Sequence, residues 1–113
     1  MKAYTHESIE LLASYQLPYF LFDPPFADLT NDARVLYALI FESMKDIEGQ
    51  DNVDEEGHHF GFIDRRAMQK KLGVSERTLV RIIERLEDKE LLRQERQGGG
   101  HLNRVYLHHP YQT

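Results

Sequence analysis

Residues 72–86 read LGVSERTLVRIIERL, and they contain the clearest structural signal in the chain. Glycine adopts the left-handed conformation without a Cβ clash, so Gly73 is typical of a residue that ends a helix. Ser75 is a favoured N-cap for a second helix, which we expect to run to about Lys89. Its apolar residues recur at helical spacing and predict a buried stripe of Leu79, Ile82, Ile83 and Leu86. The pattern indicates two helices joined by a tight turn, a helix-turn-helix motif.

The segments on either side extend this motif into a winged helix. Upstream, Asp64 is the predicted N-cap of the first helix, and Phe60–Ile63 is a short apolar run of strand type. The inner side of that helix is expected to carry Ala67, Met68 and Leu72. Downstream, Leu91–Gln97 and Asn103–Leu107 are predicted strands joined by a glycine-rich tip, Gly98–Leu102. This order predicts a winged helix-turn-helix, a mainly α fold with a small β-sheet (α+β).

One more helix is predicted before the winged motif. Thr30 is its expected N-cap, and the helix runs from about Asn31 to Lys45. Its apolar stripe consists of Ala33, Leu36, Tyr37, Ile40 and Met44. The following stretch, Glu48–His59, is acidic, polar and punctuated by glycine, so we expect an exposed loop there.

The first residues are predicted to form an arm. Pro18 breaks any helix at that point, so residues 1–23 are expected to be extended, after a short helix around Ile9–Ala13. The expected organisation is a single winged-helix domain over residues 1–113, with the arm at 1–23 and the core at 24–113.

The composition limits the classes of protein that the chain can form. Its 113 residues fit one compact domain, and a hydrophobic content of 41% is ordinary for a globular protein. There are no cysteines, which excludes disulfides, thiolate metal sites and cysteine nucleophiles. No apolar run approaches the roughly 18 residues that a membrane span needs, and the N-terminus lacks the apolar stretch of a secretory signal. We therefore expect a cytoplasmic protein without a membrane partner.

The charge is distributed unevenly along the chain. The formal net charge is −5, whereas basic domains are the usual expectation for DNA binding. Residues 1–63 hold 3 basic and 12 acidic side chains, a balance of −9, and residues 64–113 hold 11 basic and 7 acidic side chains, a balance of +4. Such asymmetry indicates a nucleic-acid surface on the second half.

The second helix of the motif carries the main candidates for DNA contact. A helix-turn-helix places this helix in the major groove with its N-terminal end leading. At 100° per residue, Arg77 and Arg81 lie almost opposite the apolar stripe, and Arg85 is nearer its flank. Further candidates near the start of the helix are Ser75, Glu76 and Thr78. The outer face also carries Glu84, Glu87 and Asp88, so an ordinary solvated surface is the alternative interpretation.

Neighbouring elements add cations that would support the contact. The first helix of the motif crosses the phosphate backbone, which makes its four basic residues candidates: Arg65, Arg66, Lys70 and Lys71. A wing approaches the flanking backbone or minor groove, and the candidates around its three glycines are Arg96, Gln97, His101, Asn103 and Arg104. The alternative interpretations are solubilising charge for the first group and a plain surface loop for the second.

The sequence gives little support for catalysis. His58-His59 and His108-His109 are adjacent pairs whose side chains diverge, and no metal-ligand spacing such as HExxH is present. The carboxylates of Asp54–Glu56 lie in an open acidic stretch, and Gly98–Gly100 precedes a strand, whereas a phosphate-binding glycine motif precedes a helix. We expect no enzyme activity, no cofactor and no metal.

Taken in order, several segments resemble the N-terminal domain of RepA-type plasmid replication initiators. These segments are YQLPYFLF (15–22), LTNDARVLY (29–37), DEEGHHF (54–60), LGVSERT (72–78) and GGHLNRVY (99–106). The resemblance implies a winged-helix domain that binds repeated double-stranded DNA sites at a plasmid origin, which in this family tends to lie within the initiator's own gene. It also implies a homodimer, and host replication proteins that are recruited through a further C-terminal domain absent from this chain.

The arm is the candidate for dimerisation, because apolar arms bury well against a two-fold partner. The residues concerned are Leu17, Tyr19, Phe20 and Phe22. The alternative is that the arm folds back onto its own core. Two other functions also remain open on the same fold: a transcriptional regulator, and a winged helix used only for protein contact.

Overall fold

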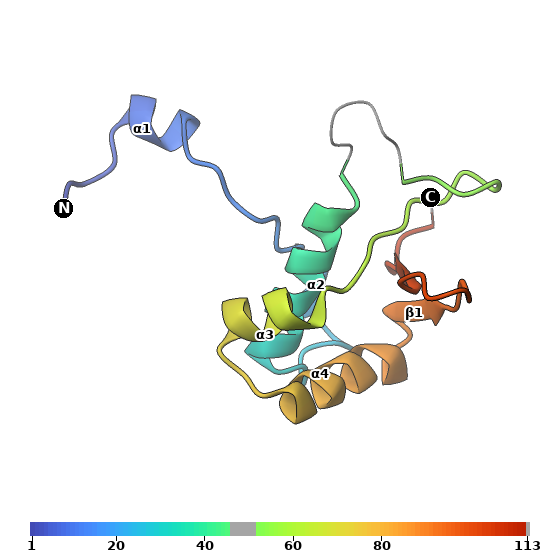
Figure 1. Cartoon of the computed structure of the whole chain (residues 1–113). Coiled ribbons are helices and arrows are strands. Elements are labelled where there is room, and N and C mark those ends of the chain that lie inside the picture. The colour runs from blue at the N-terminus through green and yellow to red at the C-terminus, as the bar shows by residue number, and fades with distance from the viewer. Residues whose placement is uncertain (46–51, 113) are drawn as a thin grey trace.

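The computed structural model describes residues 1–45 and 52–112 (Figure 1). Its helices are α1 (His6–Glu10), α2 (Asn31–Ser43), α3 (Arg65–Leu72) and α4 (Glu76–Asp88), a 3-10 helix η1 (Tyr19–Phe22) precedes α2, and the strands are β1 (Leu92–Glu95) and β2 (Arg104–Leu107). This arrangement confirms the predicted fold class, mainly α with a small β-sheet. Residues 48–51 of the predicted loop lie outside the described residues.

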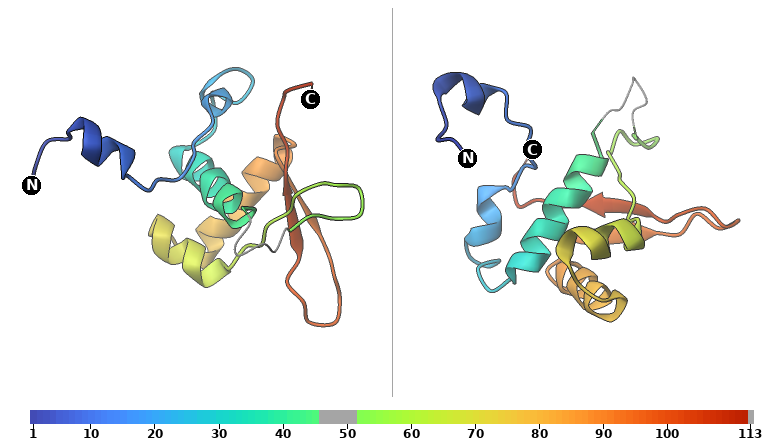
Figure 2. Two further views of the ribbon diagram at one scale, coloured as in Figure 1. Left: turned by 90° about the horizontal axis from the view of Figure 1, so that it is seen from above. Right: turned by 60° about the vertical axis from the view of Figure 1, so that its left-hand side comes forward.

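α2 lies at the centre of the fold, against α3, α4 and β2 (Figure 2). Its N-cap is Thr30, as predicted, and the hydroxyl accepts a hydrogen bond from the N–H of Ala33 at 3.2 Å. The helix ends at Ser43, slightly earlier than predicted, and Met44 is its C-cap. The predicted stripe is buried at Ala33, Leu36, Tyr37 and Ile40 and half-buried at Met44. This face of α2 is the surface on which the winged motif packs.

α3 and α4 form the predicted helix-turn-helix. Gly73 ends α3 in the left-handed conformation, with φ 68° and ψ 36°. The N–H of Val74 donates to the carbonyl of Gln69 at 3.1 Å and closes the last turn. Ser75 then caps α4 by accepting from the N–H of Thr78 at 3.2 Å. The predicted stripe of α4 is buried at Leu79, Ile82, Ile83 and Leu86, so the opposite side of α4 faces solvent.

β1 and β2 form the antiparallel hairpin predicted for the wing. Leu92 lies opposite Leu107, and Glu95 lies opposite Arg104. Because side chains alternate between the faces of a strand, one face of the hairpin packs on the core and the other faces outward. Figure 2 shows the hairpin and its tip projecting beyond the helices.

The prediction of a strand at Phe60–Ile63 is wrong. Of these four residues only Gly61 pairs with the sheet, through two hydrogen bonds to Val105 of 2.8 and 2.9 Å, and the N–H of Phe60 donates to the carbonyl of Asn52 on the opposite side. A Cβ at Gly61 would collide with the hydroxyl of Ser43 at the end of α2. The glycine therefore permits a close contact between this segment and α2, and that contact fixes the wing against the helical core.

The beginning of the arm differs from the prediction. α1 starts before the predicted Ile9–Ala13 because Thr5 caps it: its hydroxyl accepts from the N–H of Ser8 at 3.2 Å, and the Ser8 hydroxyl accepts from the N–H of Thr5 at 2.8 Å. None of the residues of α1 is buried. In both Figures 1 and 2, α1 stands apart from the rest of the molecule.

The end of the arm is part of the core. Residues 19–22 form η1 where an extended segment was predicted, and Leu21 is fully buried. The ring of Phe20 lies 5.7 Å from that of Phe26, 5.8 Å from that of Tyr37 and 5.7 Å from that of Tyr111, measured between ring centroids. The core therefore includes η1, which the prediction assigned to the arm.

A buried arginine holds this segment in place. Arg34, on α2, is only 8% exposed. Its Nε donates to the carbonyl of Leu21 at 2.9 Å and its Nη2 to that of Ala27 at 3.0 Å. Its Nη1 donates to Asn31 Oδ1 at 2.9 Å, and its Cζ lies 4.5 Å from the centroid of the Phe22 ring. One side chain thus ties η1 and the loop after it to α2.

Candidate nucleic-acid interface

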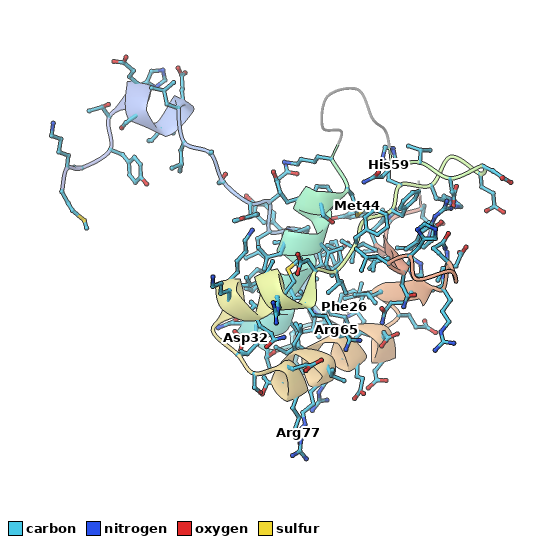
Figure 3. All side chains as sticks on the ribbon, viewed as in Figure 1. Phe26, Asp32, Met44, His59, Arg65 and Arg77 are labelled. Carbon is cyan, nitrogen blue, oxygen red and sulfur yellow. The ribbon has the colours of Figure 1, made fainter. Side chains whose placement is uncertain are left out.

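The outer side of α4 presents the arginines expected there. Arg77 and Arg81 are both exposed, on the side of the helix away from its buried stripe. Figure 3 shows Arg77 projecting away from the body of the protein at the N-terminal end of α4. Guanidinium groups in this position can pair with phosphate oxygens or make two hydrogen bonds to the edge of a guanine.

Ser75 and Thr78 have a local structural role. The hydroxyl of Ser75 accepts the capping hydrogen bond and donates to the Thr78 hydroxyl at 3.1 Å. Ser75 is exposed and Thr78 is half-buried. Their oxygens keep free lone pairs, so the prediction that they contact DNA stays a prediction beside this capping role.

Arg85 lies in a different electrostatic environment from Arg77 and Arg81. Lys89 forms an ion pair with Asp28 at 2.8 Å. The hydrogen bond from Lys89 is the main cause that holds the pKa of the Asp28 carboxyl below its ordinary value, and the charge of Arg85 adds to the effect. Arg85 lies in the last turn of α4, whereas Arg77 lies in the first turn.

The four basic residues of α3 have different surroundings. Arg65 Nη1 lies 3.6 Å from a carboxylate oxygen of Glu76, so the first residues of α3 and α4 form an ion pair. Arg66 and Lys70 are exposed and border one shallow hollow beside the turn. Lys71 donates to the hydroxyl of Tyr15 at 3.1 Å and thereby contacts the arm.

A hollow between α3, α4 and the wing joins residues from all three elements. Arg65 and Asn103, both predicted candidates, line it together with Gln94 and Leu102. Neither Gln94 nor Leu102 is among the residues that the sequence predicted to contact DNA. The alternation of the β1 strand is the signal that could have identified Gln94, because it shares the inward face with buried Leu92.

Three of the remaining wing candidates, Gln97, His101 and Arg104, line a second hollow near the tip of the wing. Arg96, Gln97 and His101 are exposed near the tip, and Gln97 donates to the carbonyl of Glu95 at 3.3 Å. Arg104 is half-buried, and its Cζ lies 4.4 Å from the centroid of the Phe60 ring. Arg104 is therefore not part of the hollow between α3, α4 and the wing, which Asn103 lines.

The acidic stretch lies against the outer face of the wing. Asp54 Oδ1 accepts from the N–H groups of Glu56 and His58, each at 2.9 Å, and Oδ2 accepts from the hydroxyl of Tyr106 at 2.9 Å. The bond from His58 is the main cause that lowers the pKa of Asp54, whereas burial, followed by the bond to Asp54, raises the pKa of Tyr106. This part of the acidic stretch is thus ordered by its own hydrogen bonds.

Of the four arm residues proposed for dimerisation, one is not available for a partner. Phe20 is only 7% exposed and packs in the core of its own chain, which is the alternative that the sequence left open. Leu17, Tyr19 and Phe22 are exposed, Tyr19 to 89%. The buried side chains of η1 therefore anchor the end of the arm to the core, while its exposed side chains and Leu17 present an apolar surface to solvent.

No helix in residues 1–45 and 52–112 is long and apolar enough to cross a membrane. In the same part of the chain, no three histidine, aspartate or glutamate side chains are grouped so that they could hold a metal ion.

The fold and the cationic surface of α3 and α4 define a winged helix-turn-helix domain. The chain belongs to the family of replication initiator protein A (RepA) N-terminal domains, whose model matches residues 13–112. This confirms the resemblance found in the sequence. A search of curated proteins finds no match.

Three solved structures are similar over nearly the whole chain. An N-terminal domain of a DNA-binding protein is 26% identical, with a TM-score of 0.75, and the alignment covers 100% of this chain and 87% of that one. A Rep–DNA complex is also 26% identical, with a TM-score of 0.75 and coverage of 99% and 87%. An MDR initiator is 27% identical, with a TM-score of 0.72 and coverage of 99% and 89%.

Proposed function

We propose that this domain binds double-stranded DNA in a sequence-specific manner at repeated sites of a plasmid replication origin, and so takes part in initiation. The observation that carries the proposal is the exposed pair Arg77 and Arg81 on α4, in a chain of the RepA N-terminal family. The similarity to a structure solved as a Rep–DNA complex supports the same conclusion.

In this mechanism α4 enters the major groove with its N-terminal end leading. Arg77 and Arg81 read base edges or pair with phosphates, while Arg66 and Lys70 on α3 contact the backbone. The exposed wing residues near the tip reach the flanking backbone or minor groove. Binding and positioning are sufficient for this role, so we propose no catalytic step and no cofactor.

The finer aspects of the proposal concern partners and location. Exposed apolar side chains on the arm, Leu17, Tyr19 and Phe22, favour a homodimer on repeated sites. Recruitment of host replication proteins is assigned to a further domain, as the family resemblance implies. Binding at a plasmid origin implies a cytoplasmic location.

Fluorescence anisotropy with duplexes tiled across the initiator's own gene, at two salt concentrations, tests the proposal. We expect tight binding to one repeated segment, with affinity that falls steeply as salt rises, because each phosphate contact releases counterions. Uniform weak binding to every duplex would refute origin binding and favour a regulator with a distant operator, or a module for protein contact.

Single substitutions identify the residues responsible. Arg77→Ala and Arg81→Ala should each weaken specific binding by about 1–3 kcal/mol if the side chain reads a base. Equal losses on specific and random DNA would assign the residue to phosphate contact. Lys45→Ala, which removes a cation beyond the C-terminal end of α2, is the matched control and should leave both affinities unchanged.

A further inference from the structure

Glu76 is the acidic residue in the first turn of α4. It is the first residue of the helix, Arg77 follows it, and Arg65 of α3 pairs with it. Its side chain is 66% exposed, and its carboxylate lies 3.6 Å from the guanidinium of Arg65, which is 54% exposed. An exposed ion pair of this kind contributes little to stability, and a carboxylate close to DNA repels phosphate.

The position of Glu76 matches a site of base contact. The N-terminal end of a recognition helix is the part that meets base edges in the major groove. Arg65, its ion-pair partner, lines the hollow between α3, α4 and the wing. DNA that contacts both α4 and the wing would therefore pass close to the Glu76 carboxylate.

We propose that Glu76 is a specificity-determining residue that selects a cytosine. Its carboxylate accepts a hydrogen bond from the N4 amino group of the base, since a carboxylate can only accept and cytosine offers a donor at that position in the major groove. Where another base presents an acceptor, the two groups repel, and the complex is weakened. Arg65 acts as a positioning residue, because its ion pair aims the carboxylate across the start of α4.

This inference rests on the proposed function, and selection from a pool of random duplexes tests both. Affinities for the selected site, for each single-base variant of it and for random duplex are then measured by anisotropy. A wild-type domain that selects no sequence would overturn the proposed function together with this assignment. A wild-type domain that selects a site without any required cytosine would overturn the assignment of Glu76 alone.

Two variants distinguish base recognition from simple charge. Glu76→Gln should raise affinity for random duplex several-fold, because it removes a repulsive charge, and should reduce discrimination at the cytosine by about ten-fold. Glu87→Gln removes the same charge from the last turn of α4 and should leave discrimination at every position unchanged. If Glu76→Gln keeps the wild-type base preference, as Glu87→Gln is expected to do, the proposal is refuted.

Glu76→Asp separates base recognition from a role in helix stability. An acidic residue in the first turn of a helix stabilises it through the helix dipole, and aspartate does this as well as glutamate. If Glu76 had only that role, the aspartate variant would bind as the wild type does. We expect the shorter side chain to lose the cytosine preference while the thermal midpoint stays unchanged.

The positioning role of Arg65 has its own test. Arg65→Met should broaden the base preference at the same cytosine position, and adding Glu76→Gln to it should broaden the preference no further. A uniform loss of affinity on all duplexes, with the base preference intact, would show that Arg65 contacts phosphate and does not position Glu76.

Discussion

The guanidinium of Arg34 donates hydrogen bonds to two backbone carbonyls of the segment before α2, those of Leu21 and Ala27. Replacing Arg34 with methionine keeps an unbranched apolar stem and removes the guanidinium with all three of its hydrogen bonds. The carbonyl of Leu21 is then left buried without this donor, which costs about 1–3 kcal/mol. The bonds to Ala27 and Asn31 are only partly buried, so water can replace the donor there at a cost of about 0.5–1.5 kcal/mol each.

The loss of these hydrogen bonds is offset in part, because methionine avoids the desolvation cost of a buried cation. We therefore expect Arg34→Met to lower the free energy of unfolding by about 3 kcal/mol. Urea unfolding followed by circular dichroism measures this value. Arg34→Lys keeps the charge but lacks the planar fork that reaches two carbonyls, so its loss should be smaller.

Arg66→Met is the matched control, since Arg66 is exposed on α3 and its replacement should change stability by about 0.5 kcal/mol or less. Limited proteolysis adds a local readout: Arg34→Met should expose residues 18–29 to cleavage under native conditions. An unfolding free energy equal to that of the control, with no new cleavage, would refute the view that Arg34 anchors η1.

Three further perturbations test other parts of the structure. Gly73→Val forces a β-branched residue into the left-handed conformation and should lower the free energy of unfolding by about 1–3 kcal/mol, which is measured as a lower thermal midpoint. An unchanged midpoint would mean that the turn does not require this conformation. Hydrogen bonds hold the pKa of Asp54 below its ordinary value, so its contribution to stability is present at neutral pH and is lost as the pH falls through that lowered value. Asp54→Asn should therefore be less stable than the wild type at pH 7, and in unfolding curves the difference should begin to shrink below about pH 4 and disappear only below the lowered pKa of Asp54; a difference that persists in stronger acid would contradict this assignment. Replacement of Leu17 and Tyr19 with serine removes two of the exposed apolar side chains of the arm and keeps the buried side chains of η1. This variant should be a monomer in sedimentation equilibrium if the arm dimerises, whereas an unchanged mass would place the interface elsewhere.

The elements that the sequence predicted are those whose signals are local. Thr30, Asp64 and Ser75 each cap the helix that follows, and Gly73 ends α3, because such residues act within three or four positions of themselves. The apolar stripes of α2 and α4 were predicted for the same reason, since a helix has one fixed period. These signals were sufficient to identify the winged motif.

The role of Arg34 had no such signal. It acts on carbonyls at positions 21 and 27, and every residue has a carbonyl, so nothing in the side chains around those positions identifies them as acceptors. The prediction of a strand at Phe60–Ile63 was wrong for a related reason. Its composition favours a strand, but how far a segment pairs depends on the path of its backbone beside β2, and here that path allows pairing at Gly61.

The candidate site shows the same division. Helical spacing was enough to place Arg77 and Arg81 on the exposed side of α4. It could not show that Lys71 contacts Tyr15, or that Arg104 stacks on Phe60, because these partners come from distant parts of the chain. The surroundings of a surface cation are tertiary information, even when its exposure is local information.

The distribution of charge in space explains how a chain of net charge −5 can present a surface suited to DNA. Salt screens interactions between exposed charges beyond a Debye length of about 8 Å under physiological conditions. The molecule measures 48 × 36 × 34 Å, so charges on the far side lie several Debye lengths from a given surface. Figure 1 places the turn after Asp54 at the end of the molecule away from α4, where its carboxylates have little effect on a phosphate that touches Arg77. Local charge therefore governs binding at α4, and the one acidic side chain of its first turn, Glu76, influences DNA binding more strongly than the whole acidic stretch around Asp54.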